Sequence, residues 1–70
     1  MVEGGLIDQA HHGGQALRAL RETVSFDQSI EAALEMVDTL NTLIIVTADH
    51  GHGLTFSGYA DRGAKVTGNN

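Results

Sequence analysis

Two clusters of acidic and histidine side chains contain most of the residues in this sequence that could do chemistry. Their members are Glu3, Asp8, His11 and His12 in a glycine-flanked turn, and Asp49, His50 and His52 directly after an apolar run. The clusters contain all 4 histidines of the chain. Carboxylate oxygen together with imidazole nitrogen suits zinc, whereas a carboxylate such as Glu3 with water molecules suits magnesium. The residue types therefore predict a site for divalent cations.

The spacing within the first cluster supports metal binding. Asp8 and His12 are four residues apart, so on a helix that begins near Asp8 the two side chains project from the same face. The alternative is structural, because Asp and His often cap helices or fill turns, and Asp8 alone could be a simple N-cap. That alternative suits any single residue, but capping does not account for two clusters that each combine acids with histidines.

A long amphipathic helix is expected between the two clusters. Residues Gln15 to Asp38 contain no Gly or Pro, and the helix is either continuous or broken near Ser25 and Phe26. Polar and charged side chains occupy much of one face. The apolar residues recur at helical spacing, at Ala16, Leu17, Leu20, Val24, Ile30, Ala33, Leu34 and Val37.

Short strands are expected on both sides of this helix. Leu43 to Val46 is an apolar run without alternation, which is typical of a strand covered on both faces in a parallel sheet. Met1 and Val2 could end a preceding strand, which would give a βαβ unit that lacks most of its first strand. Leu54 to Phe56 could form a further short strand in a region otherwise expected to be loops.

The βαβ arrangement would bring the two clusters together. Loops at the carboxyl ends of neighbouring parallel strands meet in one crevice, and both clusters follow such ends. A sheet of two strands cannot shield its second strand on both sides. The sequence therefore predicts that residues 1–70 form one partial α/β domain, cut from a larger fold, with no second domain.

Composition argues against several other classes of protein. The net charge is -5 with only 4 Lys and Arg residues, so there is no basic stripe for binding nucleic acid. The chain has no cysteine, and Leu43 to Val46 is far shorter than the roughly 18 apolar residues that indicate a membrane span. Ser25, Ser29 and Ser57 lie in no nucleophile-elbow pattern, so a serine hydrolase triad is not expected.

Three segments resemble the animal-type alkaline phosphatases. Residues 2–12, Val-Glu-Gly-Gly-Leu-Ile-Asp-Gln-Ala-His-His, are similar to the family's Val-Glu-Gly-Gly-Arg-Ile-Asp-His-x-His-His. Residues 46–52 are similar to its Val-Thr-Ala-Asp-His-Ser-His, and residues 56–63 to its Gly-Tyr-x-x-Arg-Gly turn. The resemblance covers essentially the whole chain. It implies an internal segment of a three-layer α/β/α sandwich with parallel strands.

The resemblance also implies metal ligands. Glu3 would be a ligand of magnesium. Asp8 and His12 would bind one zinc ion, and Asp49 and His50 would bind a second. The implied cofactors are therefore two zinc ions and one magnesium ion.

Two further residues would act beside these ligands. His52 would hydrogen-bond the carboxylate of Asp8, as outer partners commonly do to orient metal ligands, and Gln9 would lie near the substrate. No ligand role transfers to His11. The chain departs from the family pattern at Leu6, where Arg is common, at Gln9, where His or Lys is usual, and at Gly13, where an acid is usual.

The resemblance implies hydrolysis of phosphate monoesters through a phosphoserine intermediate. The family's nucleophilic serine and phosphate-binding arginine match nothing in this segment, so no catalytic residue is assigned and the segment alone is expected to be inactive. The complete enzyme would be a homodimer that acts outside the cytoplasm, either extracellular, periplasmic or anchored at the cell surface.

Two alternative functions are kept. One is another enzyme of the same metal-dependent superfamily, such as a phosphomutase or sulfatase, although the Glu-Gly-Gly turn and the Asp-x-x-x-His spacing argue against it. The other is a small, non-catalytic metal-binding protein. That alternative predicts folding and metal affinity in the isolated chain, whereas a segment of a larger enzyme should be largely unfolded or prone to association.

Overall fold

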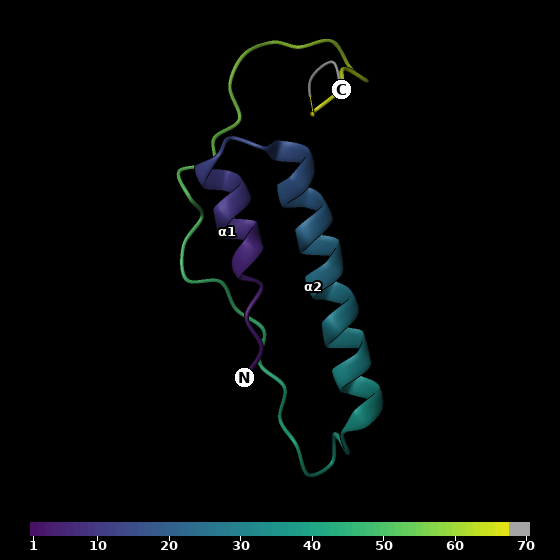
Figure 1. Cartoon of the computed structure of the whole chain (residues 1–70). Helices are drawn as coiled ribbons and strands as arrows, with labels where there is room; N and C mark the ends of the chain where they lie inside the picture. The colour runs from purple at the N-terminus through teal and green to yellow at the C-terminus, as the bar shows by residue number, and fades with distance from the viewer. Residues whose placement is uncertain (68–70) are drawn as a thin grey trace.

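Two helices joined by a short turn make up the regular structure of the chain. The computed structural model describes residues 1–67, in which α1 spans Gly5–His12 and α2 spans Ala16–Met36. The two helices pack side by side and run in opposite directions (Figure 1). After α2 the chain reverses and returns toward α1 without regular structure (Figure 1). This return brings the second cluster of acids and histidines to the first.

The segment that contains the first cluster is helical and not a turn. Gly4 is the N-cap residue of α1, so Asp8 lies inside the helix and the alternative that Asp8 is an N-cap is wrong. The helix ends where the Gly13 N–H donates to the carbonyl of Gln9 at 3.2 Å. Gly14 then takes a φ of 64°, a conformation that glycine adopts without steric cost. The glycines therefore border a helix that the sequence interpretation had placed among turns.

The long helix was predicted correctly, and it is continuous. α2 runs through Ser25 and Phe26 without a break, and Val37 follows it in an extended conformation. The chain then reverses at Asp38, whose carboxylate accepts hydrogen bonds from the Leu40 N–H at 3.0 Å and the Asn41 side-chain amide at 2.8 Å. Within residues 1–67, neither helix combines the length and apolar character needed to cross a membrane.

The two helices meet through small side chains. Among residues 1–67, the fully buried apolar side chains are Ala10 on α1, which is 0% exposed, and Ala19 on α2, which is 3% exposed. The backbone just before α1 also lies close to α2. A Cβ added at Gly4 would lie 3.0 Å from Cγ of Phe26. Small residues at these points let the helix backbones approach each other.

The prediction of an α/β fold, as a βαβ fragment of a sandwich with parallel strands, was wrong for this chain. Residues 1–67 form two helices with no strand and no sheet. A strand requires backbone hydrogen bonds to a neighbour, and the described residues provide none to Leu43–Val46 or to Met1 and Val2. Leu43 and Ile45 are 83% and 76% exposed while Ile44 is half-buried, so the apolar run is not covered on both faces.

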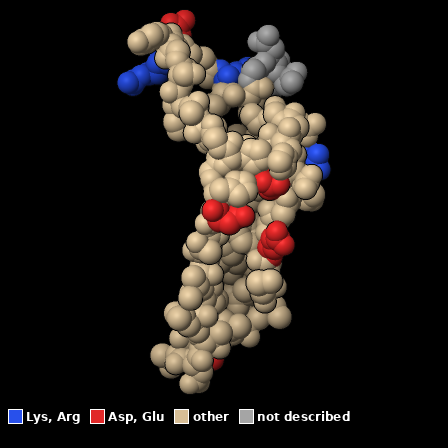
Figure 2. Space-filling view, turned by 90° about the vertical axis from the view of Figure 1, so that its left-hand side faces the viewer, with Lys and Arg blue, Asp and Glu red and all other residues tan. Residues whose placement is uncertain are grey.

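Much of the apolar surface of the chain is therefore open. The lower part of the face in Figure 2 is almost without charge, and Figure 1 places the end of α2 and the chain reversal at this height. Burial of two alanine side chains contributes only about 1–2 kcal/mol. Ordering the backbone costs roughly 1–2 kcal/mol for each residue. The described residues thus have a small core for their length.

We predict that the packing of α1 on α2 depends on the small size of Ala10. Ala10→Leu should lower the free energy of unfolding by about 1–3 kcal/mol, because the added carbons push the helices apart. Ala32→Leu, the same change at an exposed position of α2, is the matched control. Urea unfolding followed by circular dichroism measures both. Equal midpoints for the two variants would show that the helices are not closely packed at Ala10.

Candidate metal centre

The carboxylate of Asp8 is the centre of the histidine cluster. Its Oδ2 lies 3.2 Å from Nε2 of His12, and its Oδ1 lies 3.3 Å from Nε2 of His50 and 3.3 Å from Nε2 of His52. One carboxylate therefore contacts three imidazoles, and two of these, His50 and His52, belong to the second cluster, which follows α2 in the sequence. The convergence of Asp8, His12 and His50 that was expected from the sequence is present, although no sheet within residues 1–67 produces it.

Two parts of the chain position these side chains. α1 places Asp8 and His12 one turn apart on the same face, as expected for residues i and i+4. The loop at residues 49–53 supplies His50 and His52. Hydrogen bonds shape this loop: the His52 N–H donates to Nδ1 of His50 at 3.2 Å, and the Leu54 N–H donates to the carbonyl of Gly51 at 3.1 Å.

The histidine rings also contact one another. The ring of His52 packs edge-on against His12, with centroids 4.5 Å apart at 87°, and stacks on His11, with centroids 5.5 Å apart at 25°. The ring of His50 lies 5.4 Å from that of His52. All 4 histidines of the chain therefore belong to one cluster around Asp8.

The donor set fits a divalent metal ion. Asp8, His12 and His52 each offer a ligand atom, and these three atoms lie within 4.8 Å of one another. Two ligand atoms at 2.0–2.1 Å from a tetrahedral zinc ion are about 3.3 Å apart. The separations of 3.2 Å from Oδ2 and 3.3 Å from Oδ1 of Asp8 are close to that value, and they join two different carboxylate oxygens. Oxygen and nitrogen donors are of the types that zinc accepts.

Other predicted site residues lie farther from this centre. The Asp49 side chain is 91% exposed, and its Oδ2 lies 3.7 Å from Nε2 of His50. Glu3 is exposed and borders a shallow hollow of about 130 Å³ whose lining includes Glu22, Ser25 and Ser29. Glu3 therefore lies beside α2 and makes no hydrogen bond or ion pair within residues 1–67.

The remaining residues singled out from the sequence lie on α1 or contact it. Gln9 is exposed on the helix, next to Asp8. His52, predicted to bond Asp8, has Nε2 3.3 Å from its Oδ1. The contact of His11 with His52 was not foreseen. The signal for it was the three-residue separation of Asp8 and His11, which places them close together once this segment is helical.

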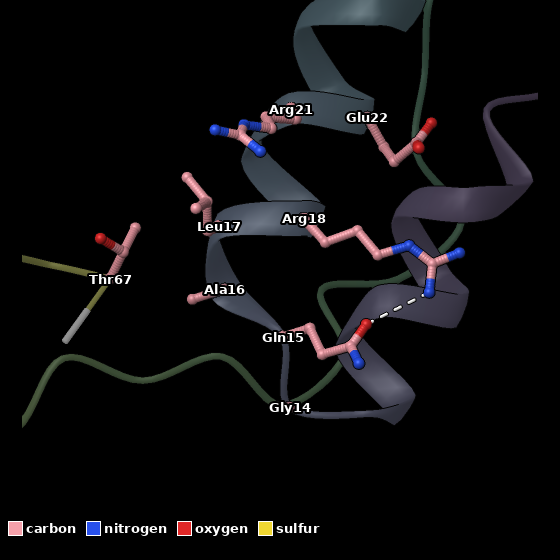
Figure 3. A pocket seen from close by; sticks show the side chains of 8 residues that line it. All are labelled: Gly14, Gln15, Ala16, Leu17, Arg18, Arg21, Glu22 and Thr67. Atoms are coloured by element: carbon pink, nitrogen blue, oxygen red, sulfur yellow. Dashed lines mark hydrogen bonds between the residues drawn. The ribbon is translucent and has the colours of Figure 1, made fainter. Parts of the chain in front are cut away.

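A larger hollow lies elsewhere and contains none of the cluster residues. Figure 3 shows this hollow at the start of α2. Its volume is about 440 Å³. Arg18 and Arg21 extend from α2 at this hollow, and Nη1 of Arg18 donates to Oε1 of Gln15 at 3.2 Å. Size alone would select this hollow, but the convergent donor atoms select the cluster around Asp8.

We predict that Asp8 holds the loop at residues 49–53 against α1. Exposed ion pairs contribute roughly 0.2–1 kcal/mol each, so Asp8→Ala, which removes contacts to three histidines, should accelerate amide hydrogen exchange at His52 and Leu54 by about 10-fold. Asp27→Ala, at an exposed position of α2, is the control. Exchange measured by NMR that is unchanged in Asp8→Ala would contradict this role.

The comparisons with known proteins agree on one family. The family described as alkaline phosphatase matches residues 1–70. Over 68 residues, which are 97% of this chain, the sequence is 54% identical to alkaline phosphatase 4 of Drosophila melanogaster. Over the same length it is 52% and 47% identical to the tissue-nonspecific alkaline phosphatase isozymes of Felis catus and Homo sapiens.

The chain spans a small part of these relatives. It covers 11% of the length of the Drosophila protein and 13% of the Felis catus and Homo sapiens isozymes. No solved structure gives a significant match. With the family match extending over every residue and with relatives of about 50% identity over 97% of its length, the chain belongs to the alkaline phosphatase family.

Proposed function

We propose that this chain supplies the metal-binding part of an enzyme that hydrolyses phosphate monoesters with two zinc ions and one magnesium ion. The reaction would proceed through a phosphoserine intermediate, with the serine outside the residues of this segment. The observation that most supports the proposal is the contact of Asp8 with His12 and His50, because it joins the two clusters that resemble the family's metal ligands. Membership of the family supports the type of reaction.

The proposed ligands divide between α1 and the loop at residues 49–53. Asp8 and His12 would hold one zinc ion, and their 3.2 Å separation suits two ligands of the same ion. Asp49 and His50, whose side chains lie 3.7 Å apart, would hold the second. Glu3 is proposed as a magnesium ligand on its sequence position alone.

A ring nitrogen of His52 lies close enough to the donor atoms of Asp8 and His12 to be counted with them. We nevertheless propose that His52 orients Asp8 and does not bind metal itself, because this is the role that the resemblance to the family implies. Nε2 of His52 lies 3.3 Å from Oδ1 of Asp8, a contact that fixes the direction of the carboxylate. Outer partners of this kind commonly account for 10-fold to 100-fold in metal affinity. Gln9, exposed beside Asp8, would lie near the substrate.

Charge explains why phosphate binding here would require cations. Glu3, Asp8 and Asp49 are carboxylates, and the chain has a net charge of -5, so the residues of the cluster by themselves would repel a phosphate ester. Bound divalent cations would reverse this local field and accept phosphate oxygens. The residues of this chain would then act by holding and orienting those cations.

The proposal extends to the surroundings of the complete protein. It would act on phosphate monoesters as a homodimer, outside the cytoplasm or at the cell surface. No role in binding nucleic acid is proposed, because the chain has only 4 Lys and Arg residues against 9 Asp and Glu residues.

We predict that the complete protein containing this segment loses hydrolysis of p-nitrophenyl phosphate when treated with EDTA and regains it with zinc and magnesium. Asp8→Ala should lower activity by more than about 100-fold, beyond the effect of an outer partner. Asp27→Ala, at an exposed site outside the cluster, should retain the activity of the unmodified protein. Turnover that resists the chelator would contradict the proposed metal dependence.

We also predict that the isolated 70-residue chain has no phosphatase activity. Ser29 donates its hydroxyl to the carbonyl of Ser25 within α2, and no serine contacts the cluster among residues 1–67. The assay uses the purified chain with zinc, magnesium and p-nitrophenyl phosphate. Turnover that persists through purification and disappears in Asp8→Ala would show that the chain provides its own nucleophile.

A further inference from the structure

We propose that His11 is a positioning residue of the metal centre, whose ring holds His52 against Asp8. The inference rests on the proposed function, because it assigns His11 to the same centre. The ring of His11 stacks on that of His52, with centroids 5.5 Å apart and planes inclined at 25°. His52 in turn contacts Asp8 at 3.3 Å. His11 therefore acts on the centre through one intermediate ring.

His52 needs such support because its backbone is unusual. Its φ is 57°, in the left-handed region that only a few per cent of residues other than glycine adopt, most often Asn, Asp and His. The residues on both sides, Gly51 and Gly53, permit many other conformations of this loop. The contacts of the His52 side chain therefore add to the hydrogen bond from its N–H to His50 in holding the observed conformation.

The burial of the cluster agrees with this role. The side chain of His52 is 23% exposed, compared with 66% for His12 and 50% for His50. His52 is thus the most enclosed of these three rings. Two consecutive residues of α1 enclose it, His12 at its edge and His11 at its face.

His11 itself has no contact that would make it a ligand. Within residues 1–67 it makes no ion pair with Asp8, and the group whose donor atoms converge consists of Asp8, His12 and His52. The feature that His11 contributes is thus its flat ring. A phenylalanine ring would preserve that contribution, whereas it would abolish any role of the ring nitrogens.

The test measures zinc affinity of the metal-depleted complete protein that contains this segment, by competition with a chromogenic chelator, together with the visible spectrum of its cobalt complex. His11→Ala should weaken zinc binding by about 10-fold and alter the cobalt spectrum, as expected for loss of an outer partner. His11→Phe should stay within about twofold of the unmodified protein. Gln28→Ala, an exposed residue of α2, is the control.

A double-mutant cycle separates positioning from a general structural effect. In a protein that already carries His52→Ala, the change His11→Ala should have no further effect on zinc affinity. The NMR signals of the His52 ring in the metal-free protein should move in His11→Ala and not in Gln28→Ala. An additive cycle, or His52 signals that do not move, would overturn the inference.

The remaining outcomes distinguish this inference from the proposed function. A complete protein containing this segment that binds no zinc would contradict the proposed metal centre and with it this role. If the complete protein binds zinc and its His11→Ala variant binds it equally tightly, only the role of His11 fails. If His11→Phe is as weak as His11→Ala, a ring nitrogen is required and stacking is not the basis of the effect.

Discussion

The structure depends on one carboxylate that joins two distant parts of the chain. The two oxygens of Asp8 are shared between His12 on its own helix and the pair His50 and His52 from the loop at residues 49–53. Without a charged acceptor at this point, three imidazoles would have little reason to gather on an open surface. The same carboxylate is also a proposed zinc ligand. The contacts that hold the loop and the proposed chemistry therefore rely on one side chain.

The elements around Asp8 serve to bring its partners within reach. α1 fixes the spacing of Asp8 and His12, and α2 provides the length over which the chain travels before it returns. The turn at Asp38 reverses the chain, and the apolar residues that follow remain exposed. Relatives in which this segment is only 11–13% of the length have much more protein available to cover such surfaces.

The sequence predicted the long helix and the meeting of the two clusters, because helical periodicity and donor residue types are local properties. It did not predict that residues 1–67 lack strands. Leu43–Val46 has residue types that favour a strand, but a strand forms only when a neighbouring segment supplies backbone hydrogen bonds. The helical state of residues 5–12 was missed because flanking glycines were interpreted as marks of a turn. Glu3 lies beside α2 because the adjacent Gly4 packs against Phe26 of that helix. The spacing of residues in the sequence does not reveal this contact.

The position of Ala10 on α1 has a consequence for how such proteins can diverge. Successive helix residues are about 100° apart, so Ala10, which packs on α2, points away from Asp8 and His12. The loop contacts α1 through Asp8, His11 and His12. The packing of α1 on α2 and the contacts of the centre therefore occupy opposite faces of α1. Evolution could then vary the size of side chains between the helices while the donor distances of the centre stay constant.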